Sequence, residues 1–201
     1  LMNENYTHPE MPEGSAEGLI KGMYLLKDAG KGKKGELRVQ LLGSGTILRE
    51  VIAAADLLDA DFGIKADIWS CPSFTELARD GVDAERWNRF HPEAKAPRKA
   101  WVTQQLEGRA GPAIAATDYI RTFANQIREY VPMRYSVLGT DGYGRSDTRA
   151  NLRRHFEVDR FHVAHAAVAA LAADGKLTAK DVARAIKLYK LDPEKQNPLL
   201  A

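Results

Sequence analysis

The sequence predicts an α/β fold in which a mixed, mainly parallel sheet of about five strands lies between helices on both faces. Short apolar runs of strand length alternate with segments of helical periodicity between residues 37 and 139. The 201 residues suffice for one generous domain, and a content of 44% hydrophobic and 28% charged residues is typical of a globular chain. Strands separated by helices imply right-handed crossovers, and therefore parallel neighbours in a three-layer arrangement.

The N-terminal part of the chain has the composition of a connecting segment. Residues 3–18 hold two prolines and two glycines among polar side chains. We therefore expect residues 1–36 to be a linker from a preceding domain and residues 37–201 to be the folded domain. The start at Leu1, directly before a methionine, leads us to expect a fragment of a longer protein.

Two short stretches lie within this predicted linker. Residues 20–26 fit either a short strand or a turn of helix. Residues 27–36 contain four lysines, for which a solvated loop is favoured over an anion-binding patch.

The alternation of strands and helices begins at residue 37. The run Leu37–Gly43 (LRVQLLG) predicts a buried parallel strand. Residues 44–59 then place apolar side chains at helical spacing and leave Arg49, Glu50 and Asp59 to water. Further strands are predicted over the following ranges: 66–70, 100–106, 112–117 and 135–139.

Capping signals locate the helices between and after these strands. Ser73 stands three residues before Glu76, which is the spacing of a capping box. Thr117 is expected to cap a helix over 118–131, and a further helix carries Leu152, His155 and Phe156. Two more helices are predicted at 160–174, ending at Gly175, and from residue 179, capped by Thr178.

Composition excludes several classes of function. A net charge of +2 is too small for a nucleic-acid-binding protein. The sequence contains no apolar span of 18 residues and no signal peptide, which argues against a membrane protein. A single cysteine, Cys71, excludes an internal disulfide framework and indicates a reducing, cytoplasmic location.

Gly43, Ser44 and Gly45 lie between a predicted strand and a predicted helix, where backbone N–H groups can hold a phosphate. The stretch matches neither the dinucleotide-binding fingerprint nor a P-loop, because position 48 is leucine and the P-loop lysine is missing. Tight packing of strand on helix is therefore favoured over a bound nucleotide.

The richest candidate is the stretch GTDGYGRSD, residues 139–147. Ser146 or Asp147 is expected to cap the following helix, and Arg145 and Arg149 can grip a carboxylate or phosphate. The alternative is that Asp141, Arg145 and Asp147 form ion pairs among themselves or across an interface. From the residues alone this second interpretation is favoured.

The remaining reactive side chains do not form a recognisable active site. His162 and His165 are three residues apart on a predicted helix, but no third metal ligand has matching spacing. Cys71 precedes a proline at a strand end and is better explained as a small buried residue than as a nucleophile. No catalytic residue is assigned.

Several blocks, collinear over essentially the whole chain, give the sequence a specific resemblance. It resembles the C-terminal part of the homodimeric pyruvate dehydrogenase E1 components of bacteria, which are transketolase-like enzymes that use thiamine diphosphate. The blocks are QLLGSGTILREV, SFTELARDG, ERWNRFHP, TDYIRTFANQIREYVP and VLGTDGYGRSDTRANLRRHFEVD.

This resemblance implies a transketolase-type C-terminal domain with an assembly role. It further implies that thiamine diphosphate and Mg²⁺ are bound by upstream domains of the parent enzyme, and that this chain binds no cofactor. The parent decarboxylates pyruvate and acetylates the lipoyl group of E2, the dihydrolipoyl acetyltransferase. The implied partners are the upstream domains, a second E1 subunit and E2. The loop at 139–147 is then expected to face those domains or that subunit.

Two other functions remain open at this point. One is an anion- or nucleotide-binding regulatory module, with the anion held by residues 43–46 or by Arg145 and Arg149. The other is an autonomous enzyme that uses Cys71, which is the less favoured of the two.

Overall fold

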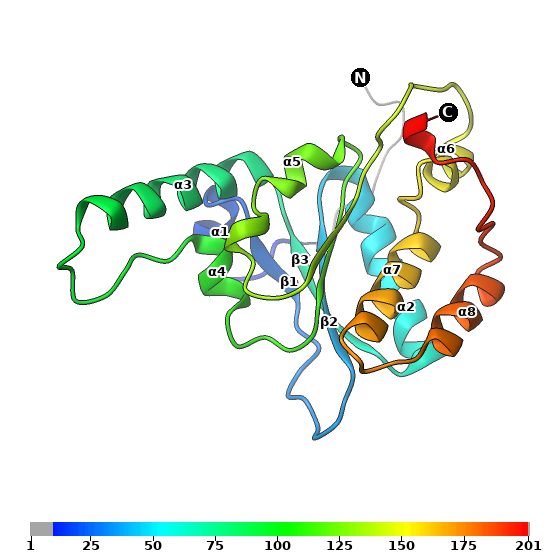
Figure 1. The fold of residues 1–201 in the computed structure, drawn as a ribbon, viewed down its shortest axis with the longest axis horizontal. Helices are drawn as coiled ribbons and strands as arrows, with labels where there is room; N and C mark the ends of the chain where they lie inside the picture. Colours follow the sequence, from blue (N-terminus) through cyan, green and yellow to red (C-terminus); the bar gives the residue numbers. More distant parts are fainter. Residues whose placement is uncertain (1–9, 201) are drawn as a thin grey trace.

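A computed structural model describes residues 10–200 of the chain. Its centre is a sheet of five strands in the order β1-β3-β2-β4-β5 (Figure 1). The pairs β3–β2, β2–β4 and β4–β5 are parallel, and β1 pairs with β3 antiparallel. The strands are β1 (Tyr24–Lys27), β2 (Arg38–Gly43), β3 (Lys65–Ser70), β4 (Ala113–Ala116) and β5 (Tyr135–Leu138). The predicted fold class is confirmed.

Helices cover both faces of this sheet (Figure 1). One hydrophobic cluster joins the sheet to α2 (Leu48–Phe62), α7 (Arg160–Ala173) and α8 (Ala179–Leu188). A second cluster joins the opposite face to α3 (Phe74–Phe90), α4 (Trp101–Leu106) and α5 (Arg121–Asn125). The shorter elements are α1 (Ala16–Ile20), α6 (Arg149–His155) and the 3-10 turns η1 (Gly45–Ile47), η2 (Arg128–Tyr130) and η3 (Pro198–Leu200).

Strand β2 shows why the sequence pattern was informative. A central parallel strand has helices on both faces, so side chains of both orientations are apolar. Val39 and Leu41 belong to the cluster under α2 and α7, whereas Leu42 belongs to the cluster under α3. All three side chains are fully buried.

Most of the predicted helix caps are present. Ser73 is the N-cap of α3 and accepts a hydrogen bond of 3.1 Å from the amide of Glu76. The second bond of the predicted capping box is not formed, because the Ser73 amide donates to the Gly22 carbonyl and the Glu76 carboxylate pairs with Arg79.

Thr178 is the N-cap of α8, and its amide donates to the Asp181 carboxylate at 2.8 Å. Gly175 has φ +69° and follows the end of α7, as expected for a left-handed residue that stops a helix.

The strand predicted at 100–106 is wrong, because this segment forms helix α4. Two of its side chains contact distant parts of the chain. The Trp101 indole donates to the Met23 carbonyl at 2.9 Å, and Thr103 donates to the Tyr130 carbonyl at 2.6 Å. These contacts dock the segment on the sheet face instead of within the sheet. The fifth strand is β1, which lies in the stretch expected to be a linker.

The helix predicted over 118–131 is also wrong in extent. Only residues 121–125 are α-helical, followed by the 3-10 turn at 128–130. Thr117, the expected cap, is fully buried instead, and its hydroxyl accepts a bond of 2.8 Å from Ser44. The Thr117 hydroxyl thus links the turns after β2 and β4. The chain turns at the sheet edge, and α5 begins only at Arg121.

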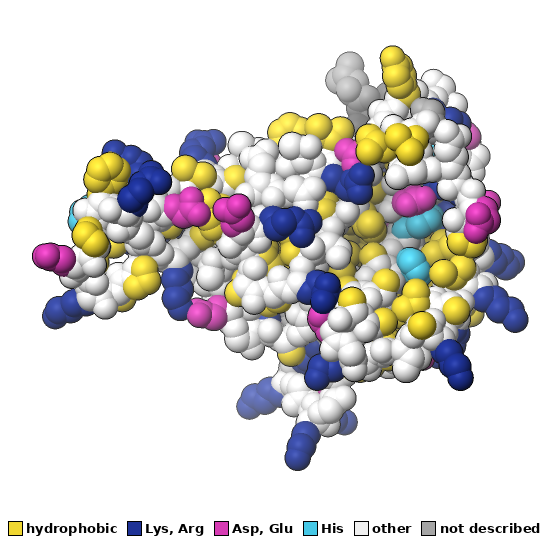
Figure 2. Space-filling model, viewed as in Figure 1, with side chains coloured by type: hydrophobic (Ala, Val, Ile, Leu, Met, Phe, Trp, Pro, Cys, Tyr) yellow, Lys and Arg dark blue, Asp and Glu magenta, His cyan; other side chains and the backbone are white. Residues whose placement is uncertain are grey.

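The lysine-rich loop between β1 and β2 projects from one end of the sheet, at the bottom of Figure 1. Figure 2 shows basic side chains gathered on this projection. Lys31, Lys33 and Lys34 are exposed. Among the described residues, no helix has the length and apolarity needed to cross a membrane.

Candidate functional site at the carboxyl edge of the sheet

The carboxyl ends of the parallel strands meet at one edge, where the turn after β2, the turn after β4 and the loop after β5 lie next to one another. Strand β2 is the point at which the strand order reverses, because β3 lies on one side of it and β4 on the other. In open α/β sheets, ligands bind at this edge and near such a reversal. The residues predicted as candidates at 43–45 and 139–149 are found here.

The glycine turn after β2 is closely packed. A Cβ atom at Gly43 would lie 2.8 Å from the Leu48 Cα atom, so the glycine allows the strand to meet the start of α2. The Ser44 hydroxyl is buried and donates to Thr117. Gly45 has φ +54° and lies against the Asp118 carboxylate. A carboxylate next to the turn repels a phosphate, so the turn by itself is a poor anion site.

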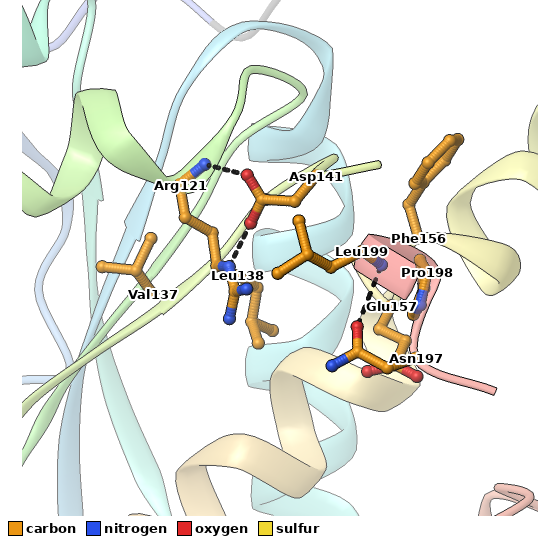
Figure 3. A pocket seen from close by; sticks show the side chains of 10 residues that line it. Arg121, Val137, Leu138, Asp141, Phe156, Glu157, Asn197, Pro198 and Leu199 are labelled. Atoms are coloured by element: carbon orange, nitrogen blue, oxygen red, sulfur yellow. Dashed lines mark hydrogen bonds and ion pairs between the residues drawn. The ribbon is translucent and has the colours of Figure 1, made fainter. Parts of the chain in front are cut away.

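The loop at 139–147 is tied to two other segments (Figure 3). Asp141 accepts hydrogen bonds from the backbone amide of Arg121, at 3.1 Å, and from its guanidinium. Gly142 has φ +105°, and a Cβ atom there would lie 2.0 Å from the Pro198 carbonyl oxygen. The glycine therefore allows the loop to touch the C-terminal turn η3. The sequence did not indicate Arg121 as the partner of Asp141.

The expectation that Ser146 or Asp147 caps the next helix is wrong. The N-cap of α6 is Thr148, whose hydroxyl accepts from the Asn151 amide at 3.3 Å. Asp147 instead accepts from the Thr148 amide at 2.6 Å and from the Asn151 side chain at 2.9 Å. These bonds, that from Asn151 above all, lower the pKa of Asp147.

Arg145 and Arg149 line a crevice of about 360 Å³ that opens between the turns after β2 and β4 and helix α6. The crevice is lined by both apolar side chains and polar residues, including three arginines. The apolar lining consists of Ile47, Leu152, Phe156 and Val158, and the remaining lining residues are Thr46, Asp118, Thr140, Gly142, Gly144, Arg145, Arg149 and Arg153. Within residues 10–200, no ion pair joins Arg145 to Asp141 or Asp147. Of the predicted candidates, Arg145 and Arg149 line this crevice, whereas Gly43, Ser44 and Gly45 do not.

Next to the crevice is a buried carboxylate, Glu50, which was predicted from helical periodicity to be exposed to solvent. Glu50 is only 4% exposed. It accepts from Arg153 at 3.0 Å, from the Arg160 amide at 3.0 Å and from the Arg160 guanidinium at 2.9 and 3.2 Å. Burial by itself raises the pKa of Glu50, but the bonds and charges of Arg160 and Arg153 outweigh it, and the pKa is lowered. Helical periodicity could not reveal the two arginines more than 100 positions away.

Cys71 and the two histidines are separate from the crevice lining. Cys71 is fully buried, and burial raises the pKa of its thiol, which makes it a poor nucleophile. His162 is bound through Nδ1 to Asp159 at 2.7 Å, and Asp159 caps α7. Burial lowers the pKa of His165, whose Nε2 atom has no hydrogen-bond partner in the described part of the chain.

The fold is that of a three-layer α/β domain with a crevice at its carboxyl edge. A family model described as the transketolase-like C-terminal domain matches residues 22–159, and the chain belongs to this family. The solved transketolase from Pichia stipitis in complex with sedoheptulose 7-phosphate is similar in fold, with a TM-score of 0.54 and 19% identity. That match covers 85% of this chain and 21% of that chain.

Curated relatives are much closer in sequence. The chain is 58% identical to the pyruvate dehydrogenase E1 component of Cupriavidus necator over 199 residues, which is 99% of this chain and 22% of the relative. Its identity to the same component of Pseudomonas aeruginosa is 58%, with the same coverage. The chain is 52% identical to the pyruvate dehydrogenase E1 component of Escherichia coli K12, over 100% of this chain and 22% of the relative. The chain therefore spans about a fifth of the length of these relatives.

Proposed function

We propose that this chain is the C-terminal assembly domain of a pyruvate dehydrogenase E1 component and is not catalytic by itself. The observation that carries the proposal is the identity of 58% along 99% of the chain to proteins of that name. In this proposal the parent enzyme decarboxylates pyruvate with thiamine diphosphate and reductively acetylates the lipoyl group of E2. The chain contributes contacts to the upstream domains of its own subunit and to a second E1 subunit.

The residues described do not fit thiamine diphosphate with Mg²⁺. A metal-bound diphosphate needs oxygen ligands for the cation and N–H donors for the phosphates. Among residues 10–200, no three His, Cys, Asp or Glu side chains are grouped to hold a metal ion. At the glycine turn after β2, Gly43 is packed against Leu48 and the Ser44 hydroxyl donates to Thr117, so neither is available to a diphosphate. We propose that both the cofactor and its cation are bound by upstream domains of the parent.

Exposed aromatic side chains at the carboxyl edge support the assembly role. Tyr143 at the tip of the loop after β5 is 86% exposed, and Tyr119 and Phe123 near α5 are 63% and 40% exposed. Tyrosine and phenylalanine are enriched in protein interfaces. We propose that the surface formed by Tyr143, Tyr119 and Phe123 faces the rest of the subunit or the second subunit, in a multienzyme complex in the cytoplasm.

Activity measurements test the proposal directly. We expect the purified chain to release no CO₂ from pyruvate and to show no saturable binding of thiamine diphosphate with Mg²⁺ in calorimetric titration. A truncated E1 that lacks this segment should be inactive and should recover activity when the segment is restored. Intact E1 of Cupriavidus necator serves as the positive control. Detectable decarboxylation by the isolated chain would falsify the non-catalytic assignment.

A further inference from the structure

Three arginines of one short stretch line the carboxyl-edge crevice. Arg149 and Arg153 are four residues apart on α6 and therefore lie on one face of that helix, and Arg145 comes from the loop before it. Asp118 is a carboxylate in the same lining and Glu50 pairs with Arg153, so these five side chains together carry a charge of about +1. An arginine presents a planar set of donors that suits carboxylate and phosphate oxygens.

The position of one of these arginines is set from behind. Glu50 is buried and holds the Arg153 guanidinium through Nη1 at 3.0 Å. Arg153 is only 19% exposed, and it lines the crevice next to Arg149. Because the carboxylate that anchors it is enclosed by the protein, little side-chain freedom remains to be lost when a ligand binds. A guanidinium fixed in this way is a preorganised donor.

The opposite side of the crevice limits where an anion can lie. The Thr46 hydroxyl donates to the Asp118 carboxylate at 3.4 Å, and the Thr140 hydroxyl donates to the Asp118 carbonyl at 2.6 Å. Asp118 repels an anion from the glycine turn, so the arginine side of the crevice is the favourable side. The field there is positive: the pKa of His155 is lowered by partial burial and by the charges of Arg145 and Lys195.

The shape of the crevice suits a small organic molecule. Its volume of about 360 Å³ lies within the range of ligand sites, and part of its lining is apolar. Leu152 and Phe156 offer a surface for a flat or aliphatic group next to the arginines. A bare inorganic ion would leave this surface unused.

We propose that this crevice binds a small organic anion, whose phosphate or carboxylate group contacts Arg145, Arg149 and Arg153 and whose apolar part lies on Leu152 and Phe156. The assembly contacts proposed for the same loop involve its tip at Tyr143, which does not line the crevice. The proposal stands independently of the proposed function, since it concerns ligand binding by the folded domain.

Calorimetric titration with simple probes tests it. Phenyl phosphate and benzoate carry the two anionic groups on the same ring, phenol carries no charge at neutral pH, and inorganic phosphate lacks the ring. We expect saturable binding of at least one of the two ring-bearing anions, weaker binding of inorganic phosphate and none of phenol. The tighter of the first two identifies the anionic group. If neither ring-bearing anion binds saturably, or phenol binds equally well, the proposal is overturned.

Charge-neutralising variants locate the site. Arg145 is exposed, so Arg145→Gln should leave the melting temperature unchanged. It should lower the binding affinity for the ring-bearing anion about tenfold, which corresponds to about 1.4 kcal/mol for one lost charged hydrogen bond. The matched control is Arg79→Gln on α3, whose side chain is 73% exposed and remote from the crevice lining. Equal weakening in both variants would indicate binding to net charge alone and would overturn the proposal.

The same titration with the intact E1 subunit decides whether the crevice is open in the longer protein. We expect the subunit to bind the probe with an affinity within about threefold of that of the chain, a difference of about 0.7 kcal/mol. Binding by the isolated chain together with no binding by the subunit would show that protein covers the crevice, and would overturn the proposal.

Discussion

At the amino edge of the sheet, a buried carboxylate is enclosed by its own chain. Asp67 on β3 is 2% exposed. It accepts from the Ala29 amide at 2.9 Å, from the Gln40 side chain at 3.0 Å and from Arg109 at 3.3 Å. Gln40 in turn accepts from the Trp69 indole at 2.9 Å. Each donor to Asp67 comes from a different part of the fold, and together these groups satisfy the buried carboxylate within the chain.

At the carboxyl edge, the charged groups are arranged differently. Arg145 and Asp147 are exposed, and the crevice next to them is lined by further arginines. Glu50 near this edge resembles Asp67 in burial, and it pairs with Arg153 on α6 and Arg160 on α7.

The difference separates charges that hold the domain together from charges that are available to other molecules. A polar group that is enclosed must be paired within the chain, because an unpaired buried donor or acceptor costs about 1–3 kcal/mol. Groups at an open edge have no such requirement. We therefore expect substitutions at the amino edge to reduce stability, and those at the carboxyl edge to change binding or assembly.

The largest effect on stability is expected from Asp67→Ala. It removes the acceptor of three donors, of which Arg109 is 30% exposed and can recover some hydration. We expect a loss of about 3 kcal/mol in the free energy of unfolding, at the low end of the range for a broken buried pair. Urea denaturation followed by circular dichroism measures it.

The control for Asp67→Ala is Asp59→Ala. Asp59 is 51% exposed and pairs with Lys65 at 2.6 Å, so it should cost at most about 1 kcal/mol. Equal losses in the two variants would contradict the distinction between enclosed and open charges.

Glu50→Gln is expected to have the next largest effect, a loss of about 2 kcal/mol in the free energy of unfolding at neutral pH. This value is below that of a fully enclosed pair because Arg160 is 44% exposed and solvent screens it. The pKa of Glu50 is lower in the folded state than its value of about 4.3 in the unfolded state. The ionised carboxylate therefore stabilises the folded state fully above about pH 4.3, and this stabilisation is lost as the pH falls through the folded-state pKa.

The difference in stability between wild type and Glu50→Gln should therefore shrink as the pH falls below about 4. Unfolding curves across this range provide the measurement, with Glu76→Gln, on an exposed pair with Arg79, as the control. A difference that does not depend on pH would rule out the ionised carboxylate as the stabilising form.

Gly142→Ala should have a smaller and local effect. Its φ of +105° and the 2.0 Å approach of a Cβ atom to the Pro198 carbonyl would push the loop from the C-terminal turn, at a cost of about 1–2 kcal/mol. Gly144→Ala is the matched control, since a Cβ atom there meets nothing within 4 Å. Amide hydrogen exchange at Leu199 and Leu200 should rise only in the first variant. Equal exchange in both would contradict the contact.

The smallest effect on folding is expected when Arg145 and Asp147 are replaced together. Both are exposed, and Asp147 contacts only the start of α6 among the described residues. The melting temperature of the chain should stay unchanged, whereas dimer dissociation and activity of the parent E1 should be affected. A chain that melts far lower while the parent dimer is unaltered would identify the loop as an internal brace.

The sequence by itself determined the parts of this protein that depend on local patterns. The apolar run of β2, the cap at Ser73 and the stop at Gly175 each lie within a few residues of the feature they specify. Burial on both faces requires a continuous apolar strand, and a helix end requires a side-chain acceptor or a left-handed residue. These requirements are visible without knowledge of any neighbour.

Only the tertiary structure decided which distant groups meet. Residues 101–106 form α4 on the sheet face, where Trp101 and Thr103 donate to carbonyls elsewhere in the fold. Glu50 is buried because Arg153 and Arg160 compensate its charge. The crevice joins Thr46 to Arg145 because parallel strands bring their carboxyl ends to a single edge. Pairing energies of this kind depend on distance in space, which helical or strand periodicity does not encode.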